Sequence, residues 1–254
     1  MASPILREGQ VRTIEYLRRA NVKFSDGFER IMRHSFEYAD PLCAGLVLWA
    51  TQACGGDSHA AVPLAASVEC LHRFATLHDE LQMMPSYSIE RETTSSIWGL
   101  AQTLNAGDAF HALGMGLLAQ GSLHRDRVLD AGIVLEKAVL RSVEERNRLV
   151  NGAMRVRGGS RLRVAYNGTQ ATMLGVSLHV GAIMADAPMP LTRTLLRAGR
   201  LLGVVVQLQS QAYGRSSALA KRYAAKASML VEATTLAPRY AAEFKEIAHE
   251  LAGS

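Results

Sequence analysis

The sequence is poor in cysteine and in aromatic residues, and this limits the kinds of protein it can encode. Its 254 residues include three cysteines, and 6% of them are aromatic. The cysteines are odd in number and form no C-x-x-C pair, so neither a disulfide framework nor a structural zinc site is indicated. Cys43, Cys54 and Cys70 each lie among apolar residues, which is typical of reduced thiols buried in a core.

The sequence also lacks a hydrophobic leader and a long uncharged apolar run. The N-terminal segment MASPILREGQ contains no apolar signal region. No segment of ~18 uncharged apolar residues occurs outside a plausible core helix. We therefore expect a cytoplasmic protein with no membrane span.

Positive charge is in mild excess but is not concentrated in one tract. The net charge is +5, which favours anionic ligands in general. The most basic stretch, Arg155–Arg163, has no aromatic side chains interleaved with its arginines. Because nucleic-acid surfaces normally combine a clustered basic stripe with aromatic stacking platforms, we expect no nucleic-acid partner.

Apolar residues make up 48% of the chain, which is enough for a packed core. Their spacing is helical nearly everywhere, and no alternating strand pattern is evident. The segments predicted as helices are Arg7–Arg19, Ser25–Met32, Pro41–Ala53, Ala61–Met84, Ser95–Gln120, Arg125–Met154, Leu162–Ala185, Leu191–Tyr213 and Ser217–Leu251. Since the longest helices suit a bundle and no linker divides the chain, we predict a single all-α domain, residues 1–254, around a central apolar pocket.

One predicted helix, Ala61–Met84, ends in a histidine and two acids. His78, Asp79 and Glu80 stand near its C-terminal end, and Pro85 closes it. Carboxylate oxygens suit hard cations such as magnesium, which makes the two acids candidate metal ligands. On spacing alone, two solvated acids at a helix end are the alternative.

Stretches spread from Phe36 to Gly214 share the pattern of one known family. They are Leu46–Gly56 (LVLWATQACGG), Val68–Glu80 (VECLHRFATLHDE), Trp98–Ala119 (WGLAQTLNAGDAFHALGMGLLA), Gly181-Ala182 and Leu196–Gln207 (LRAGRLLGVVVQ). In order and spacing they resemble the trans-isoprenyl diphosphate synthase family, whose polyprenyl synthetase fold is shared with class I terpene synthases. The resemblance implies an all-α isoprenoid synthase fold, a cavity that holds a prenyl chain, and a mouth where magnesium binds the diphosphate between two aspartate-rich motifs.

The chain departs from both of these motifs. The first has the form DDxxD in the family, and here Asp79 and Glu80 fill its first two positions while methionine replaces the last acid. The resemblance therefore makes Asp79 and Glu80 the candidate catalytic residues and the ligands of a weakened Mg²⁺ site. The second motif maps to Leu208–Gly214, which contains no acid, and leaves Gln207 and Gln211 as neutral candidate substrate contacts.

The family's isopentenyl diphosphate site is also missing from the sequence. Its arginine pair maps to Ser88-Ile89 and its lysine maps near Thr169-Gln170, so Arg91 is the only basic residue in the loop after the first motif. A multiply charged diphosphate needs charge-assisted donors. Chain elongation is therefore the least favoured activity, and Arg91 is a candidate substrate contact.

Further candidate substrate contacts lie just before the first motif. Phe74 and Ala75 precede Asp79 by about one turn, and we predict that they share its helix face, with His78 beside them. In the family this level sets the length of the prenyl chain, and a phenylalanine there implies a pocket for roughly C10–C15. Plain core packing of Phe74 is the alternative. Farther along, Glu144-Glu145-Arg146 looks like a solvated helix face, although an acid there that faced the pocket would be a substitute metal ligand.

Two functions of different classes follow from the resemblance. The first is a divergent terpene synthase-like enzyme that ionises a short allylic prenyl diphosphate and cyclises or eliminates the cation. The second is a non-catalytic subunit of a heteromeric prenyl diphosphate synthase, because the family dimerises through the helices around Trp98–Ala119, the best-matched part of the chain. The expected partners are thus a prenyl diphosphate and either a second copy, as a homodimer, or an active prenyl synthase, as a heterodimer.

Overall fold

The fold is almost entirely helical, as predicted. The computed structural model describes residues 4–19, 23–37, 42–83, 87–88, 91–120, 125–150, 168–209 and 217–253. Its helices are α1 (Pro4–Arg19), α2 (Asp26–Glu37), α3 (Leu42–Ala53), α4 (Val62–Met83), α5 (Thr94–Leu118), α6 (Arg125–Val150), α8 (Thr169–Met184), α9 (Met189–Gln209), α10 (Ser217–Glu232) and α11 (Pro238–Leu251). Two short strands, β1 (Tyr87–Ser88) and β2 (Arg91–Glu92), pair antiparallel between α4 and α5.

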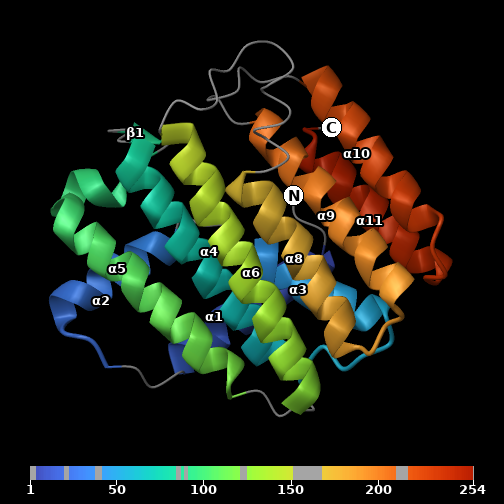
Figure 1. Cartoon of the computed structure of the whole chain (residues 1–254), viewed down its shortest axis with the longest axis horizontal. Coiled ribbons are helices and arrows are strands. Elements are labelled where there is room, and N and C mark those ends of the chain that lie inside the picture. The colour runs from blue at the N-terminus through green and yellow to red at the C-terminus, as the bar shows by residue number, and fades with distance from the viewer. Residues whose placement is uncertain are drawn as a thin grey trace.

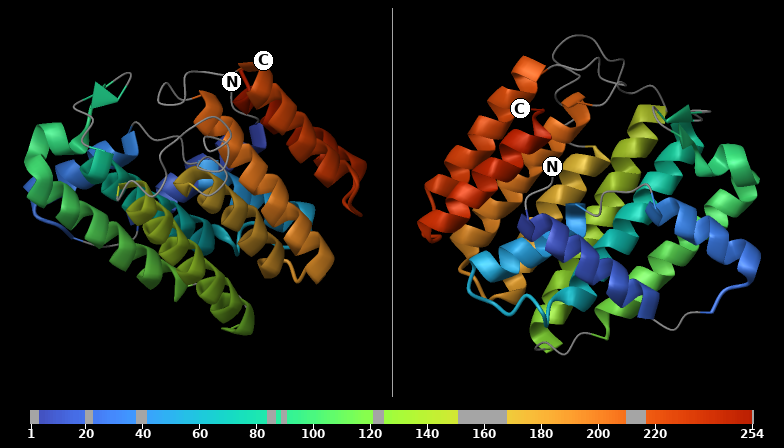
Figure 2. Two further views of the ribbon diagram at one scale, coloured as in Figure 1. Left: turned by 45° about the horizontal axis from the view of Figure 1, so that its top comes forward. Right: turned by 180° about the vertical axis from the view of Figure 1, so that it is seen from behind.

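The helices form a bundle whose middle is occupied by α4, α6 and α8 (Figure 1). On one side lie α2 and α5, and on the other lie α9, α10 and α11. Seen from behind, α1, α2 and α3 cross the bundle (Figure 2). This arrangement places helices that are distant in sequence, such as α4 and α8, in contact.

Aliphatic side chains from most of these helices make up the core. The main cluster runs from α1 to α11, and its large buried members include Leu46, Trp49, Leu71, Leu135, Leu174, Leu202 and Phe244. A smaller cluster around Phe110 and Leu77 joins α2, α4 and α5. Because α3 and α8 are buried on nearly every side, their sequences are apolar all round.

The backbones of α8 and α9 approach each other closely at a glycine. A Cβ atom built on Gly203 would lie 2.3 Å from the Cα of Ala171. No side chain fits in that distance, so the glycine sets the separation of the two helices. The position of α8 at the centre of the bundle therefore depends on the small residues of α9.

The C-terminal segment differs from the prediction. Ser217–Leu251 was expected to form one helix, but it forms α10 and α11 with a turn between them. Pro238 stands at the first position of α11, after Ala237 in an extended conformation. Proline has no N–H and its ring clashes with the preceding turn, so it starts a helix and does not continue one.

None of the helices within the described ranges is both long and apolar enough to cross a membrane. Several predicted helix ends, among them Met154 and Leu162, lie outside the described residues. The assignment of residues 1–254 to one domain stays a prediction.

Candidate functional site

One edge of the bundle brings together the C-terminal ends of α4 and α6 and the N-terminal end of α8 (upper part of Figure 1). At this edge Asp79 of α4 forms an ion pair with Arg146 of α6. The side chain of Arg146 is 5% exposed, whereas that of Asp79 is 38% exposed. The first acid of the predicted motif therefore faces a buried guanidinium.

Arg146 also ties α8 to α4. Its Nη2 donates to the carbonyl of Ala75 at 2.9 Å and to Oγ1 of Thr169, the first residue of α8, at 3.0 Å. The planar guanidinium carries five N–H groups in a fixed fork, which lets one side chain serve several acceptors. Arg146 is thus the polar centre at which three helices meet.

Glu80, the second acid, is turned toward a different partner. Its carboxylate accepts a hydrogen bond at 3.2 Å from the backbone N–H of Thr94, the first residue of α5. The side chain of Thr93 caps the same helix by accepting from the N–H of Ser96. A carboxylate beside a helix N-terminus is stabilised by the unpaired N–H groups and by the helix dipole, so Glu80 stabilises the start of α5.

A magnesium ion does not fit these donors. Magnesium needs a near-octahedral set of oxygens supplied by carboxylates, waters and phosphates. Here Asp79 already faces a full positive charge, and Glu80 is directed at α5. The helix that would carry the opposing motif, α9, has no aspartate or glutamate. The arrangement predicted for Mg²⁺ at Asp79 and Glu80 is therefore not the one that the described residues form.

Phe74 does not lie on the same side of α4 as Asp79, which differs from the prediction. Its ring centroid lies 4.4 Å from that of His78 and 5.1 Å from that of His111 in α5. Ala75 is buried, and its carbonyl faces α6. Residues four apart share a helix face, whereas adjacent residues are rotated by about 100°. Consequently Phe74 and His78 face α5, while Ala75 and Asp79 face α6.

His78 fits against α5 because the residue opposite is Gly107. A Cβ atom at Gly107 would lie 2.5 Å from Cε1 of His78, so a larger residue requires a shift of the imidazole. Nε2 of His78 lies 3.7 Å from a carboxylate oxygen of Asp108, whose side chain is mostly exposed. His78 therefore packs between helices, and its contact with a substrate stays a prediction.

The remaining predicted substrate contacts are described only in part. Gln207 lies half-buried in α9. Arg91 has its backbone in β2, and its side chain is outside the described part of the structure. Gln211 lies entirely outside the described residues.

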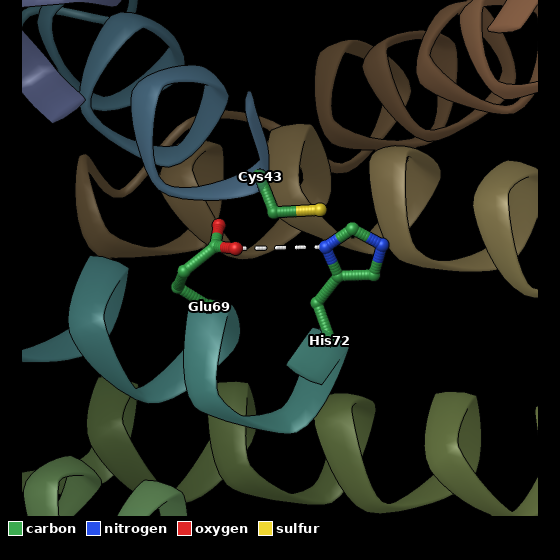
Figure 3. A group of neighbouring side chains, drawn as sticks. All are labelled: Cys43, Glu69 and His72. Carbon is green, nitrogen blue, oxygen red and sulfur yellow. Dashed lines mark ion pairs between the residues drawn. The ribbon is translucent and has the colours of Figure 1, made fainter. Parts of the chain in front are cut away.

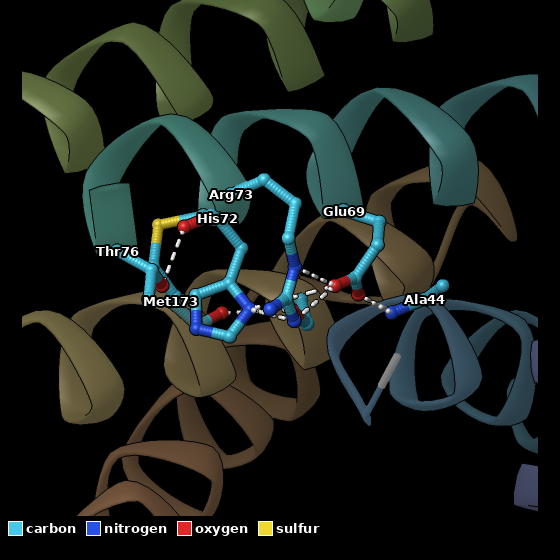
Figure 4. Close-up of polar contacts among 7 residues, drawn as sticks. Ala44, Glu69, His72, Arg73, Thr76 and Met173 are labelled. Carbon is cyan, nitrogen blue, oxygen red and sulfur yellow. Dashed lines mark hydrogen bonds and ion pairs between the residues drawn. The ribbon is translucent and has the colours of Figure 1, made fainter. Parts of the chain in front are cut away.

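A second polar cluster is buried where α4 passes the start of α3 (Figures 3 and 4). Glu69 is fully buried and accepts hydrogen bonds from Nε and Nη2 of Arg73, at 2.9 and 2.7 Å. Its other oxygen accepts from the backbone N–H of Ala44 at 3.3 Å. Cys43 and His72 lie beside this pair, with Nδ1 of His72 3.6 Å from Glu69.

Charges within this cluster shift two pKa values. Burial alone would raise the pKa of Glu69, but the charge of Arg73 and a hydrogen bond with His72 outweigh it and lower the pKa to about 2. Burial likewise disfavours a charged His72, but the neighbouring Cys43 and Glu69 outweigh it and raise the pKa to about 9. The cluster is therefore a charged network inside the core.

Cys43, Glu69 and His72 are the one group of possible metal ligands found within the described ranges, with ligand atoms within 4.8 Å of one another. Both carboxylate oxygens of Glu69 already accept hydrogen bonds. A metal ion would also lie beside the Arg73 guanidinium. We therefore interpret the group as a structural network that holds α3 against α4.

Similarity to known proteins is found in both sequence and fold. No model of a known protein family matches the chain. The chain is 34% identical over 178 residues to the (2E,6E)-farnesyl diphosphate synthase of Mycobacterium tuberculosis strain H37Rv, covering 66% of this chain and 47% of that protein. It is 29% identical over 177 residues to the geranylgeranyl diphosphate synthase of the same strain, covering 65% and 47%.

Solved structures of similar fold cover nearly the whole chain. The geranylgeranyl pyrophosphate synthetase of Geoglobus acetivorans matches with a TM-score of 0.86 at 16% identity, over 98% of this chain and 100% of that one. The polyprenyl synthetase of Streptomyces coelicolor A3(2) matches with a TM-score of 0.80 at 18% identity, over 99% of both. These sequence relatives and structural neighbours are isoprenyl diphosphate synthases, the family that the sequence resembles.

The comparisons support a protein of the prenyl diphosphate synthase type and do not single out a terpene cyclase. The chain spans about half the length of these two curated relatives, because the match covers 47% of each. A mint heterotetrameric geranyl pyrophosphate synthase, as a deletion mutant, also shares the fold, with a TM-score of 0.76 at 18% identity over 96% of this chain and 99% of that one.

Arg146 is the residue of this edge that the sequence analysis did not identify. The solvated face predicted for Glu144-Glu145-Arg146 is right for Glu144, which is exposed and pairs with Arg148 at 2.8 Å, and wrong for Arg146. The helical period of α6 offers a signal: Ala138, Val139, Ser142 and Arg146 are buried at three- and four-residue spacing.

Proposed function

We propose that this chain binds a short allylic prenyl diphosphate, of roughly C10–C15, at the edge formed by α4, α6 and α8. The proposal rests on the position of Arg146, whose buried guanidinium lies where the ends of α4, α6 and α8 meet. Guanidinium groups recognise phosphate oxygens through paired hydrogen bonds. The N-terminal end of a helix, here α8, favours the same anion.

The prenyl chain would extend from this edge along the apolar surfaces of α4 and α8. Leu71 and Ala75 of α4 are buried, and α8 is apolar all round. The rings of Phe74, His78 and His111 pack between α4 and α5. Because that side is filled, the prenyl chain would have to lie toward α6 and α8.

If the bound prenyl diphosphate reacts, the chain is a terpene synthase-like enzyme. Such an enzyme breaks the C–O bond of the allylic diphosphate and releases inorganic diphosphate. The cation, with or without closing a ring, then loses a proton to give a hydrocarbon or captures water to give an alcohol. Ionisation needs positive charge around the leaving diphosphate, and of the residues at this edge Arg146 supplies one guanidinium, already paired with Asp79. We assign no step to magnesium, because the donors do not fit it. The described residues thus favour binding over ionisation.

A second candidate function, a subunit of a prenyl diphosphate synthase, is favoured by an apolar surface on α5 and α6. Its exposed members on α5 are Ile97, Leu100, Leu104 and Met115, and those on α6 are Leu129, Ile133, Leu140 and Val143. Leu100 is 53% exposed and Leu129 is 64% exposed. Large apolar patches on soluble proteins usually mark an interface. A second copy of this chain or an active synthase would cover it.

Two measurements on the purified protein test these functions. Calorimetric titration with geranyl, farnesyl and geranylgeranyl thiodiphosphates measures binding without turnover. Gas chromatography after incubation with the corresponding diphosphates, with and without magnesium, measures hydrocarbon or alcohol products. The variant Arg148→Gln is a matched control, because Arg148 is an exposed arginine two residues from Arg146 on the same helix.

Each result decides between the functions. Binding of the geranyl or farnesyl analogue supports the proposal, and the absence of binding by all three analogues rejects it. Products above those of an Asp79→Ala control assign the enzyme. Binding without products, together with co-purification with an active prenyl synthase, assigns the subunit.

A further inference from the structure

We propose that the Arg146 guanidinium is a resident cation at Asp79 that excludes a divalent metal ion from this edge. The two groups form an ion pair, and Arg146 makes two further hydrogen bonds to α4 and α8. At this motif, which resembles a metal site in sequence, the positive charge therefore comes from a side chain of the protein and not from a metal ion. The second part of the inference, which rests on the proposed function, is that a prenyl diphosphate binds here without magnesium.

The first reason is the burial of Arg146. Its side chain is 5% exposed, and Nη2 is engaged by Ala75 and Thr169. If the guanidinium moved away from Asp79, it would lose its hydrogen bonds to Ala75 and Thr169. The charge of Arg146 would also lose its counter-charge, which is strongly unfavourable at a buried position. Ala75 of α4 and Thr169 of α8 therefore hold Arg146 in place together with Asp79.

The second reason is electrostatic. A divalent cation bound to Asp79 would lie close to the guanidinium and be repelled by it, and the partly buried edge screens this repulsion less than bulk water does. Arginine keeps its charge at every pH at which proteins are folded. The exclusion is therefore independent of pH, unlike one based on a histidine or lysine.

Among the described residues, not every nitrogen of the Arg146 guanidinium has an acceptor. Nε and Nη2 donate to Asp79, Ala75 and Thr169, whereas Nη1 donates to none of the described residues. Nη1 carries N–H groups that can donate to a phosphate oxygen. The same side chain can thus neutralise Asp79 and receive one end of a diphosphate beside the start of α8.

Titration of the ligand-free protein with Mn²⁺, followed by the loss of the free-ion electron paramagnetic resonance signal, tests the resident cation. We expect no Mn²⁺ site at Asp79 in the wild type. In Arg146→Gln, a neutral side chain that keeps a hydrogen-bond donor, we expect at least tenfold tighter Mn²⁺ binding, lost again in the double variant Asp79→Asn/Arg146→Gln. Arg146→Lys keeps the charge and should behave as the wild type.

The exposed control Arg148→Gln should gain no Mn²⁺ site. One bound Mn²⁺ in the wild type that disappears in Asp79→Asn overturns the inference, and this result needs no Arg146 variant. Arg146→Gln that melts as the wild type but gains no Mn²⁺ site also overturns it, because the charge would then not be the cause of the exclusion.

Titration with farnesyl thiodiphosphate in EDTA and in magnesium tests the second part. We expect the two dissociation constants to agree within twofold, and Arg146→Gln to weaken binding in EDTA by at least tenfold. Binding that requires magnesium overturns the metal-free site. Failure to bind in either condition rejects the proposed function and leaves the Mn²⁺ result to judge Arg146 independently.

Discussion

Asp79 and Arg146 stand 67 residues apart in the chain and form an ion pair across the edge between α4 and α6. The acid comes from a sequence motif that suggests a magnesium ligand, and the base comes from a helix whose sequence suggests a solvated surface. Their pairing converts a candidate metal ligand into the counter-ion of a buried arginine. The chemistry of this edge therefore depends on a contact between two helices.

The first prediction concerns the stability that this pair provides. Asp79→Asn removes the charge opposite a buried guanidinium, so the free energy of unfolding should fall by about 2–3 kcal/mol. Urea unfolding followed by circular dichroism measures the change. Glu144→Gln, which breaks the exposed pair with Arg148, is the control and should cost at most about 0.5 kcal/mol. Equal losses in the two variants would contradict the prediction.

The second prediction is a stability maximum set by the buried network of Glu69 and His72. The pKa of Glu69 is lowered from 4.5 to about 2 in the folded state, so its contribution is present above pH 4.5 and is lost as the pH falls toward 2. The pKa of His72 is raised from 6.5 to about 9, so its contribution is present below pH 6.5 and is lost as the pH rises toward 9. Thermal unfolding across pH should show the highest Tm between 4.5 and 6.5.

Variants separate the two limbs of that profile. Glu69→Gln should lower the free energy of unfolding by roughly 3–5 kcal/mol, because Arg73 loses its buried counter-charge, and should flatten the acid limb. His72→Gln should flatten the alkaline limb and keep the acid one. A profile that keeps both limbs in both variants would place the pH dependence elsewhere in the protein.

The third prediction concerns the close packing of His78 on α5. Gly107→Ala should destabilise the protein by about 1–3 kcal/mol, because the added Cβ would lie 2.5 Å from the imidazole. Gly116→Ala on the same helix is the matched control, since a Cβ there meets no atom within 4 Å. Alanine is the better helix former, so the control should be neutral or up to ~1 kcal/mol more stable. Chemical denaturation of both variants compares them directly.

The fourth prediction concerns the apolar surface on α5 and α6. Leu100→Glu and Leu104→Glu should shift the protein from a dimer or larger assembly to a monomer, because each variant buries a charge in the interface. Sedimentation velocity measures the change. Met229→Glu is the control, because Met229 is 67% exposed on α10, away from this surface. A wild-type protein that sediments as a monomer, with no active synthase bound, would contradict the proposed interface.

Local sequence patterns account for most of the secondary structure. Apolar residues at three- and four-residue spacing predicted the helices from α1 to α9, since a helix in a bundle must bury one face. The break between α10 and α11 was missed although Pro238 marks it, because a strong apolar period continues on both sides of the proline. Because proline lacks the backbone N–H that a helix interior uses, Pro238 indicates a helix boundary at that position.

The candidate site was only half accessible from the sequence. Asp79 and Glu80 could be located because they end an apolar helix in a familiar order, and the lack of acids on the later helix could be read directly. The sequence did not predict which neighbouring helix each face of α4 contacts. Phe74 lies toward α5 and Ala75 toward α6, a difference of one residue that depends on how α4 is rotated in the bundle.

The sequence alone determined that this chain is helical, apolar in its core and short of the acids that a pair of metal motifs requires, because these properties follow from residue type and spacing. Only the tertiary structure decided which partner each remaining acid has. Asp79 meets Arg146, and Glu80 meets the start of α5, because the packing of α4 against its neighbours fixes the direction of each side chain. No local pattern encodes those directions, since they arise from the burial of all the helices together.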